Sequence, residues 1–184
     1  MGGSPGGPGA GPVQASFGKT MSSTSEKGVE HVNTRTEPDS FEKWDTMPPH
    51  KQKELLTQKP LNSPRPKKWV KLGGQISISE NGVWCYSMVI DGNTITVNYK
   101  YGREGYPDFE EAGVVIAGVK IDPFKGDKSD FGRADKAKIE EEGSPKADTS
   151  TWHHNEDMIH MQEIPTKIHR RFTHRGGASK AKKK

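Results

Sequence analysis

The middle of the chain carries three runs of β-favouring residues that predict an antiparallel meander. The runs cover residues 75–79, 83–90 and 94–101 and are rich in isoleucine, valine, tyrosine and threonine. Glu80-Asn81-Gly82 joins the first two runs, and Asp91-Gly92-Asn93 joins the last two. Both linkers suit hairpins, because Asn-Gly and Asp-Gly tolerate the positive φ that tight turns require. We therefore expect three consecutive strands, each paired with the next.

Helices and one more strand are predicted on either side of this meander. Upstream, residues 40–44 and 49–58 resemble short helical pieces separated and closed by prolines. Downstream, residues 114–121 form another apolar strand. Ser129 can then cap a helix that runs to Glu142 and stops at Gly143.

A strand, a second strand and a short helix are predicted near the end of the chain. His153 and His154 belong to the first strand, and the brief apolar stretch at 159–164 forms the second. Pro165 suits the first position of a helix, which then presents His169 in its second turn. The fold class is therefore α+β: an antiparallel β meander with short helices and a C-terminal strand–strand–helix module.

Length and composition predict one globular domain preceded by an unfolded leader. Nine of the first twelve residues are Gly or Pro, and only 29% of the chain is hydrophobic. Residues 1–27 therefore bury too little surface to fold. We expect a domain at 28–178 and a basic tail at 179–184. The leader is either a linker from an upstream delivery module or a remnant of expression.

The chain has no long apolar run, so neither a transmembrane helix nor a secretory signal peptide is expected in it. Cys85 is the single cysteine, which excludes an intramolecular disulfide and suits a reducing cytoplasm. Its position inside a predicted strand indicates a buried structural thiol.

Positive charge is concentrated at the C-terminal end. The chain has 28 Lys and Arg against 24 Asp and Glu, and eight of the basic residues lie from Lys167 onward, where there is no acid. The 20 basic residues upstream are thus outnumbered by acids. Such a run attracts nucleic-acid phosphates by counterion release, or is simply a solvated tail, and both interpretations stay open.

Five of the seven histidines lie between positions 153 and 174 and suggest a metal-assisted phosphodiesterase. His153 and His154 are adjacent, so in a strand they point to opposite faces, and one can hold a metal ion while the other accepts a proton. A strand histidine and the helical His169 can ligate one divalent ion and leave positions open for a phosphate oxygen and water. Imidazole titrates near pH 6.5, which suits a general base.

Purely structural roles are also open for residues of this stretch. A closed structural zinc site is possible, although such sites generally include cysteines and this stretch has none. His160 is expected at the surface or behind the site. Trp152 and Phe172 are expected to be core anchors rather than base-stacking groups.

Several of these motifs together resemble the WHH branch of the HNH/endonuclease VII nuclease superfamily. The motifs are Trp152-His153-His154, Met161-Gln162, His169 and His174-Arg175-Gly176-Gly177. The resemblance extends upstream through Tyr106-Pro107-Asp108-Phe109, Asp130-Phe131 and the segment 132–142, which is similar to the lead-in of that family's toxin domains. It covers about residues 106–177.

The resemblance implies a ββα-metal core at about 150–177 that hydrolyses phosphodiester bonds, with DNA favoured over RNA. By position in the motif, His154 is similar to the general base, His153 and His169 match metal ligands, and His174 matches a further ligand. One divalent ion is implied, and its identity is left open among zinc, nickel, manganese and magnesium. Mixed nitrogen and water ligation suits magnesium less well than the others.

The spacing of His169 and His174 adds a geometric expectation. In an unbroken helix, residues five apart are turned about 140° from one another. The helix must therefore end or bend near Phe172 if both rings are to reach one ion. Gly176-Gly177 makes such an ending plausible, because glycine is common just beyond a helix C-terminus.

The resemblance also implies partners and a biological setting. Nucleic acid is the expected substrate, and Arg103, Arg133, Arg170 and Arg171 are candidates to contact phosphate. The setting is the C-terminal cytotoxic domain of a bacterial toxin or secreted effector in interbacterial competition. It would be delivered out of the producing cell, act in the target-cell cytoplasm and be neutralised by a cognate immunity protein. The alternative is a non-enzymatic, metal-stapled nucleic-acid-binding or adaptor module.

Overall fold

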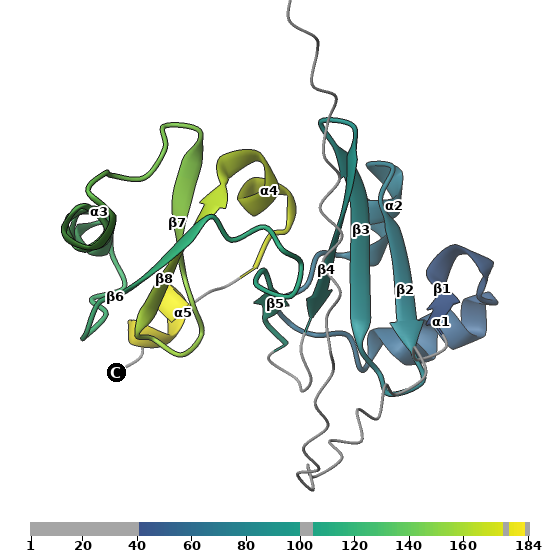
Figure 1. Ribbon diagram of the computed structural model, residues 1–184. Helices are drawn as coiled ribbons and strands as arrows, with labels where there is room; N and C mark the ends of the chain where they lie inside the picture. The colour runs from purple at the N-terminus through teal and green to yellow at the C-terminus, as the bar shows by residue number, and fades with distance from the viewer. Residues whose placement is uncertain (1–40, 100–104, 175–176, 183–184) are drawn as a thin grey trace, which may run out of the picture. The chain divides into compact units, whose positions relative to one another are not determined.

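The computed structural model describes residues 41–99, 105–174 and 177–182, which form two antiparallel sheets and several short helices (Figure 1). The α+β class is as predicted. The first sheet has the strand order β1-β2-β3-β4-β5. Its strands are β1 (Phe41–Lys43), β2 (Gln75–Ser79), β3 (Trp84–Ile90), β4 (Asn93–Tyr99) and β5 (Pro107–Asp108). The leader at 1–27 lies outside the described residues.

The predicted meander is confirmed in β2, β3 and β4. Gln75 pairs with Ser87, and Trp84 pairs with Tyr99, so each strand runs antiparallel to the next. The turn between β3 and β4 has Asp91 at φ 50° and Gly92 at φ 80°. Two consecutive positive φ values are the feature for which Asp-Gly was expected in this hairpin.

The helices of this part differ from the prediction at two places. Residues 41–43 form an edge strand rather than a helix, because their backbone pairs with Ser77–Ser79 of β2 and that pairing overrides weak local propensity. A short 3₁₀ turn, η1 (Trp44–Thr46), follows this strand. Helix α1 (Pro49–Leu56) was predicted, whereas α2 (Pro66–Lys71) was not.

An aromatic cluster forms the core against this first sheet. Trp69 of α2 is buried and contacts Tyr86 of β3 at a ring-centroid distance of 5.4 Å. It also contacts Phe172 at 5.0 Å. Because Phe172 lies near the C-terminal end, this contact ties the last part of the chain to the first sheet. Cys85 is buried in β3, as expected of a structural thiol.

The second sheet has the order β6-β8-β7 and carries the C-terminal histidines. Its strands and helices are β6 (Ala117–Lys120), α3 (Ser129–Glu142), β7 (Ser150–His154), β8 (His160–Pro165), α4 (Thr166–Arg171) and α5 (Gly177–Ala181). The predicted order of strand, turn, strand and helix is confirmed in β7, β8 and α4. The strand expected at 114–121 is shorter, since only residues 117–120 pair with β8.

Helix α3 has the predicted extent, but its N-terminus is capped differently. Gly143 follows it in the left-handed conformation, at φ 77°, as a glycine stop requires. Ser129 is the first helical residue rather than the cap. Its backbone amide and hydroxyl both donate to the carboxylate of Asp127, which satisfies the free donor at this end.

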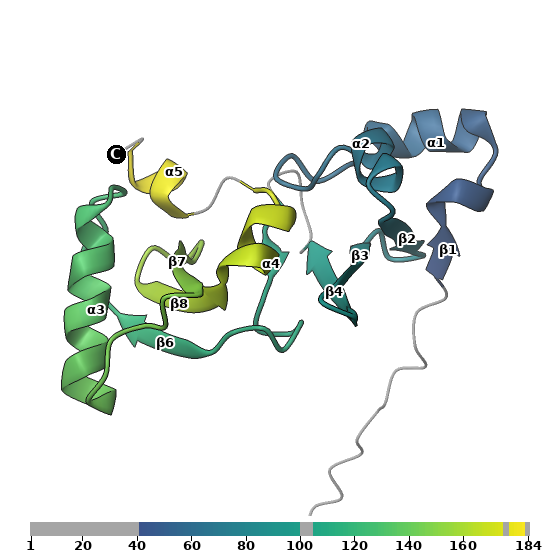
Figure 2. The same ribbon diagram turned by 90° about the horizontal axis from the view of Figure 1, so that it is seen from above.

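Helices α3 and α4 lie on opposite sides of the second sheet, as the two views show (Figures 1 and 2). Toward α3, the sheet presents Glu163, which is fully buried and bonded to Lys138 Nζ at 2.6 Å and to the amide of Ala147 at 2.8 Å. Trp152 Nε1 donates to Asp135 of α3. A buried ion pair is stable only when its groups are paired and hydrogen-bonded, so these contacts fix α3 on β7 and β8.

Among the helices of the described residues, none is both long enough and apolar enough to span a lipid bilayer.

Candidate metal centre

The alternation of side chains along β7 separates the two adjacent histidines. Trp152 and His154 face α3, whereas His153 faces the opposite side, where its ring meets Phe109 at 5.0 Å between centroids. His153 is buried, at 3% exposure. The prediction that these two imidazoles point to opposite faces is therefore confirmed.

His153, His169 and His174 converge on that face. Each offers a ring nitrogen, and these nitrogens all lie within 4.8 Å of one another. The ring centroids are 4.6 Å apart for His153 and His174, 5.1 Å for His169 and His174, and 5.5 Å for His153 and His169. The structure thus brings together the three residues predicted as metal ligands.

His174 reaches the cluster because α4 ends where its geometry requires. The helix stops at Arg171, and Phe172 leaves the helical conformation with ψ at 71°. The expectation of an ending near Phe172 is confirmed. Of the two glycines expected to help this ending, Gly176 lies outside the described residues and Gly177 begins α5. A Cβ on Gly177 would lie 2.1 Å from the carbonyl oxygen of Asn155, so close packing requires glycine there.

The hydrogen bond from His174 Nδ1 leaves Nε2 as the nitrogen that can bind a metal ion. Its Nδ1 donates to the carbonyl of Phe172 at 2.7 Å, so Nε2 carries the ring's lone pair and accepts a hydrogen bond from His153 Nδ1. This Nε2 is 3.0 Å from His153 Nδ1. Two nitrogens bound tetrahedrally to one ion at roughly 2.0–2.1 Å lie about 3.3 Å apart, so the observed pair is close to ligand spacing. The three imidazoles therefore fit a divalent ion.

All three rings are held in the neutral form that ligation needs. Burial lowers the pKa of His153 well below its usual value, and the neighbouring imidazoles lower it further. Burial also lowers the pKa of His169 to about 4, helped by His174 and His154. For His174, burial lowers the pKa although its bond to Phe172 opposes this. At neutral pH none of these rings carries the second proton that would block ligation.

Phe109 forms the apolar wall of the cluster. Its ring lies 5.0, 6.2 and 5.5 Å from the rings of His153, His169 and His174, respectively. The side chain is 1% exposed. It follows β5, and the sequence resemblance had included it only as part of a lead-in motif. A buried ring in contact with all three imidazoles accounts for much of their desolvation.

His154 has a different environment from the other three. Its Nε2 is 3.0 Å from Asp130 Oδ2 of α3, and its ring packs between Phe124 and Phe131. It lies outside the ligand cluster, yet it is near enough to lower the pKa of His153 and of His169 electrostatically. With Nε2 donating to the carboxylate, Nδ1 is the nitrogen left to accept a proton.

The hydrogen bonds around Asp130 keep its carboxylate ionised. Burial raises its pKa, but the amides of Lys125 and Gly126 and the imidazole of His154 outweigh that effect, so the pKa lies below its usual value. Arg133 Nη1 also donates to Asp130 Oδ1 at 3.1 Å. Sequence reasoning did not pair Asp130 with His154, because the two lie 24 positions apart and meet only through the packing of α3 on the sheet.

The four arginines predicted to contact phosphate have different surroundings. Arg103 lies outside the described residues. Arg133 Nη1 and Nη2 donate to the carbonyls of Pro123 and Asp122, in addition to the bond to Asp130. Arg170 and Arg171 are exposed on α4, and the helical repeat turns them by about 100° and 160° from His169. Phosphate contact stays a prediction for each of them.

Lys167, Arg170 and Arg171 line a pocket of about 420 Å³ against the end of β3. Lys167 Nζ donates to both carboxylate oxygens of Asp91 at 2.8 and 2.9 Å. His160, by contrast, is exposed and bonded to Asp157, in line with the surface position expected for it. Trp152 and Phe172 are buried core anchors, as expected.

A known protein family matches the part of the chain that carries these histidines. Residues 145–184 match the family model described as WHH, a nuclease of the HNH/ENDO VII superfamily with conserved WHH. The match contains all three residues of the ligand cluster together with His154, and it implies metal-dependent nuclease activity. It begins after α3, so Phe109 and Asp130 lie outside it. Among curated proteins, no match to the chain is found.

Metal-free protein should lose stability as the pH falls from 7 to 5. An unfolded imidazole binds a proton near pH 6.5, whereas His169 in the folded protein does so only near pH 4. Below pH 6.5 the unfolded state therefore takes up protons that the folded state does not. Linkage predicts that His169 alone lowers the free energy of unfolding by roughly 3 kcal/mol when the pH reaches 4.

Urea unfolding in chelator at several pH values measures this dependence. The His169→Asn variant should show a shallower decline between pH 7 and 5, because its side chain does not titrate. Equal declines in the two proteins would show that the imidazole is not desolvated as described.

Proposed function

We propose that this protein is a metal-dependent endonuclease that hydrolyses phosphodiester bonds of DNA. The observation that carries the proposal is the convergence of His153, His169 and His174 inside a segment that matches a nuclease family. Three protein ligands are typical of catalytic metal sites, in which a further position stays open for substrate or water.

The three histidines would hold a single divalent ion. A bound ion supplies Lewis-acid stabilisation of the charge that develops on the phosphate and the leaving oxygen. The three imidazole nitrogens suit zinc or nickel better than magnesium. Phe109 keeps the rings neutral and limits their contact with water, so the nitrogens are ready to bind.

His154 is proposed as the general base. Asp130 holds Nε2 and fixes the tautomer, so Nδ1 is free to take a proton from the attacking water. The ionised carboxylate then stabilises the imidazolium that forms. In this role Asp130 is a positioning residue, since it acts through His154 rather than on the substrate.

The preference for DNA over RNA rests on the family resemblance, because metal-assisted hydrolysis does not need a 2′-hydroxyl and can act on either nucleic acid. The exposed Arg170 and Arg171 of α4 line one pocket with Lys167, and this group of cations supports a polyanionic substrate. Contacts from these side chains to phosphates would orient a strand without reading its sequence.

Plasmid DNA incubated with the protein and Mn²⁺, Ni²⁺, Zn²⁺ or Mg²⁺ should be nicked and shortened, and chelator should stop the reaction. His154→Ala should lower the rate at least about a hundredfold with little change in Ni²⁺ affinity, because it removes a proton acceptor and not a ligand. His169→Ala should weaken both cleavage and Ni²⁺ binding measured by calorimetry.

The matched control is His50→Ala, which alters an exposed histidine of α1 and should cut at the parental rate. Parental cleavage by His154→Ala would refute the base assignment. A wild-type protein that retards plasmid in gels but never shortens it would instead be a binding module.

Asp130→Asn should slow cleavage by about tenfold or more while leaving metal affinity intact, because it removes the charge that orients His154. Adding Asp130→Asn to His154→Ala should cost nothing further, since the carboxylate acts only through that ring. Asp148→Asn, at an exposed position, is the control. An additive loss in the double variant would show that Asp130 acts by another route.

We further propose that the protein is the cytotoxic domain of a bacterial toxin or effector, delivered out of its producing cell and restrained by an immunity protein. The similarity of residues 106–142 to the lead-in of toxin domains supports this setting. The single buried thiol of Cys85 suits action in a reducing target-cell cytoplasm.

Induced expression in a bacterial cytoplasm should therefore arrest growth with degradation of cellular DNA, and His154→Ala should restore growth. Growth that continues unchanged, at expression levels where the recovered protein cleaves plasmid, would count against the toxin role.

A further inference from the structure

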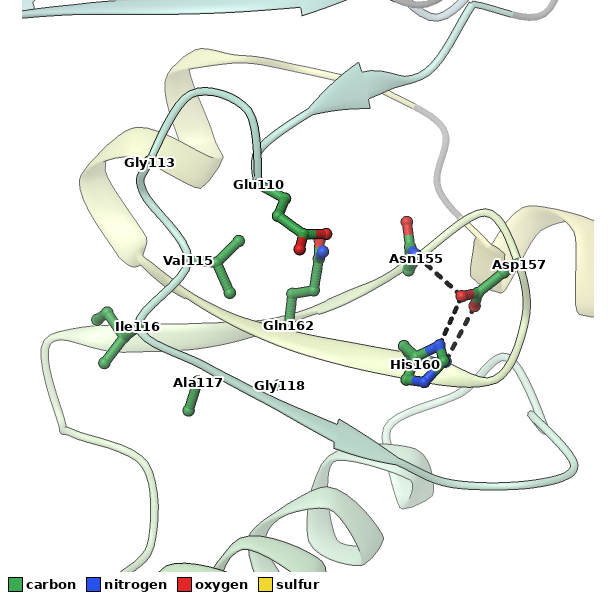
Figure 3. Close-up of a pocket in the computed structure, with 10 residues that line it drawn as sticks. All are labelled: Glu110, Gly113, Val115, Ile116, Ala117, Gly118, Asn155, Asp157, His160 and Gln162. Carbon is green, nitrogen blue, oxygen red and sulfur yellow. Dashed lines mark hydrogen bonds and ion pairs between the residues drawn. The ribbon is translucent and has the colours of Figure 1, made fainter. Parts of the chain in front are cut away.

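A pocket of about 740 Å³ opens on the same face of the second sheet as the metal centre (Figure 3). Gly118 of β6 pairs with Gln162 of β8, and Gln162 pairs with His153 of β7. Side chains of directly paired residues project to the same face of a sheet. Gly118, Gln162 and His153 therefore form one row, with the pocket over its first two members and the metal ligand at its end.

The segment around Phe109 closes the other side of this arrangement. Phe109 contacts all three ligand imidazoles, and the next residue, Glu110, lines the pocket. The pocket and the centre thus share a wall as well as a sheet face. A group that occupies the pocket would sit beside whatever the metal centre holds.

Gly118 leaves open space in the floor of the pocket. A Cβ built on this residue meets no heavy atom within 4 Å, although the residue lies inside a strand. Glycine weakens a strand unless something must approach closely, and the missing side chain here enlarges the pocket. The volume lies within the range of roughly 300–1,000 Å³ that is usual for small-molecule sites.

The lining suits a nucleobase and not a phosphate. Among the described residues no Lys or Arg lines the pocket, whereas Glu110 and Asp157 do. Phosphate is better served by the separate pocket of Lys167, Arg170 and Arg171. Val115 and Ile116 supply apolar surface for the face of a base, while Gln162 and Glu110 supply polar groups for its edge (Figure 3).

Asp157 is already engaged, so Glu110, Gln162 and the exposed ring of His160 are the polar groups that can face a ligand. Asp157 accepts hydrogen bonds from the amides of Ile159 and His160 and from the side chain of Asn155, and it is also bonded to the His160 ring. It therefore braces the turn between β7 and β8. A carboxylate such as that of Glu110 accepts from an exocyclic amine, and a glutamine amide can both donate and accept.

We propose that this pocket binds an unstacked nucleobase that carries an exocyclic amine, taken from the strand being cut. Glu110 accepts from the amine, Gln162 bonds the adjacent edge, and Gly118 makes room for the ring. The inference rests on the proposed function, because it assumes a nucleic-acid substrate. It adds a base preference next to the cut, which the nuclease chemistry alone does not require.

The test compares oligo-dC with oligo-dU, which differ by an amine against a carbonyl at C4 and by the proton on N3. Binding of fluorescent single strands to the full chain is followed by anisotropy in chelator, so the readout does not depend on cleavage. The wild-type protein should bind oligo-dC at least about fivefold more tightly. Equal affinity for the two strands, or no binding of either, would overturn the proposal.

Two variants locate the preference in the pocket. Glu110→Gln should abolish it, whereas Glu111→Gln, with the same change of charge on an exposed neighbouring residue, should keep it. Gly118→Leu should also abolish it by filling the floor. Gly132→Leu, an exposed helical glycine whose added Cβ likewise meets nothing, is its control. A preference that survives Glu110→Gln and Gly118→Leu would overturn the assignment to this site.

Cleavage of the same strands in Mn²⁺ separates this proposal from the proposed function. Faster cutting of oligo-dC than of oligo-dU by the wild-type protein, with the difference lost in Gly118→Leu and kept in Gly132→Leu, supports both. If no metal ion supports cleavage while the binding preference persists, the nuclease proposal fails and the base pocket stands. If both strands are bound and cut equally, the pocket proposal alone fails.

Discussion

The pleat of β7 is the constraint on which the site depends. Because consecutive strand residues face opposite ways, a single dipeptide places one imidazole among the ligand cluster and the next against a carboxylate on the other side. A slip of one residue in the pairing with β8 would exchange the two roles. The buried Trp152 and the bond between Glu163 and Lys138 hold that register, since both are matched to positions on α3.

The ligand cluster also depends on aromatic packing from outside the strand pair. Phe172 ends α4 and packs on Trp69, so the backbone that carries His174 is anchored to the core of the first sheet. Phe109 reaches the same imidazoles from the segment after β5. The first sheet thus positions two elements of the site without contributing a ligand of its own.

The features that sequence could predict are those set by neighbouring residues. The hairpin at Asp91-Gly92, the helix ending at Gly143 and the opposed faces of His153 and His154 follow from local backbone rules, and all are present. The edge strand at 41–43 was mistaken for a helix because its conformation comes from pairing with β2. The partnership of Asp130 and His154 was missed for the same reason: it exists only once α3 has packed on the sheet.

A similar limit applies to the glycines. The role of Gly143 could be predicted because ending a helix depends on local backbone conformation. Gly177 was expected to follow a helix, but it begins α5 and packs against the carbonyl of Asn155. Spacing alone correctly required α4 to stop near Phe172, and the buried Phe172 directly follows the last residue of that helix.

Because Phe109 contacts all three imidazoles, the histidine cluster depends on a residue outside the segment that matches the nuclease family. The segment 145–184 matches the nuclease family and contains all four histidines of the site. Three residues that surround these histidines or anchor their backbone come from earlier in the chain. They are Phe109 of the apolar wall, Asp130, which is bonded to His154, and Trp69, on which Phe172 packs. A change at Phe109 or Asp130 can therefore alter the surroundings of these histidines without changing any residue of the matched segment.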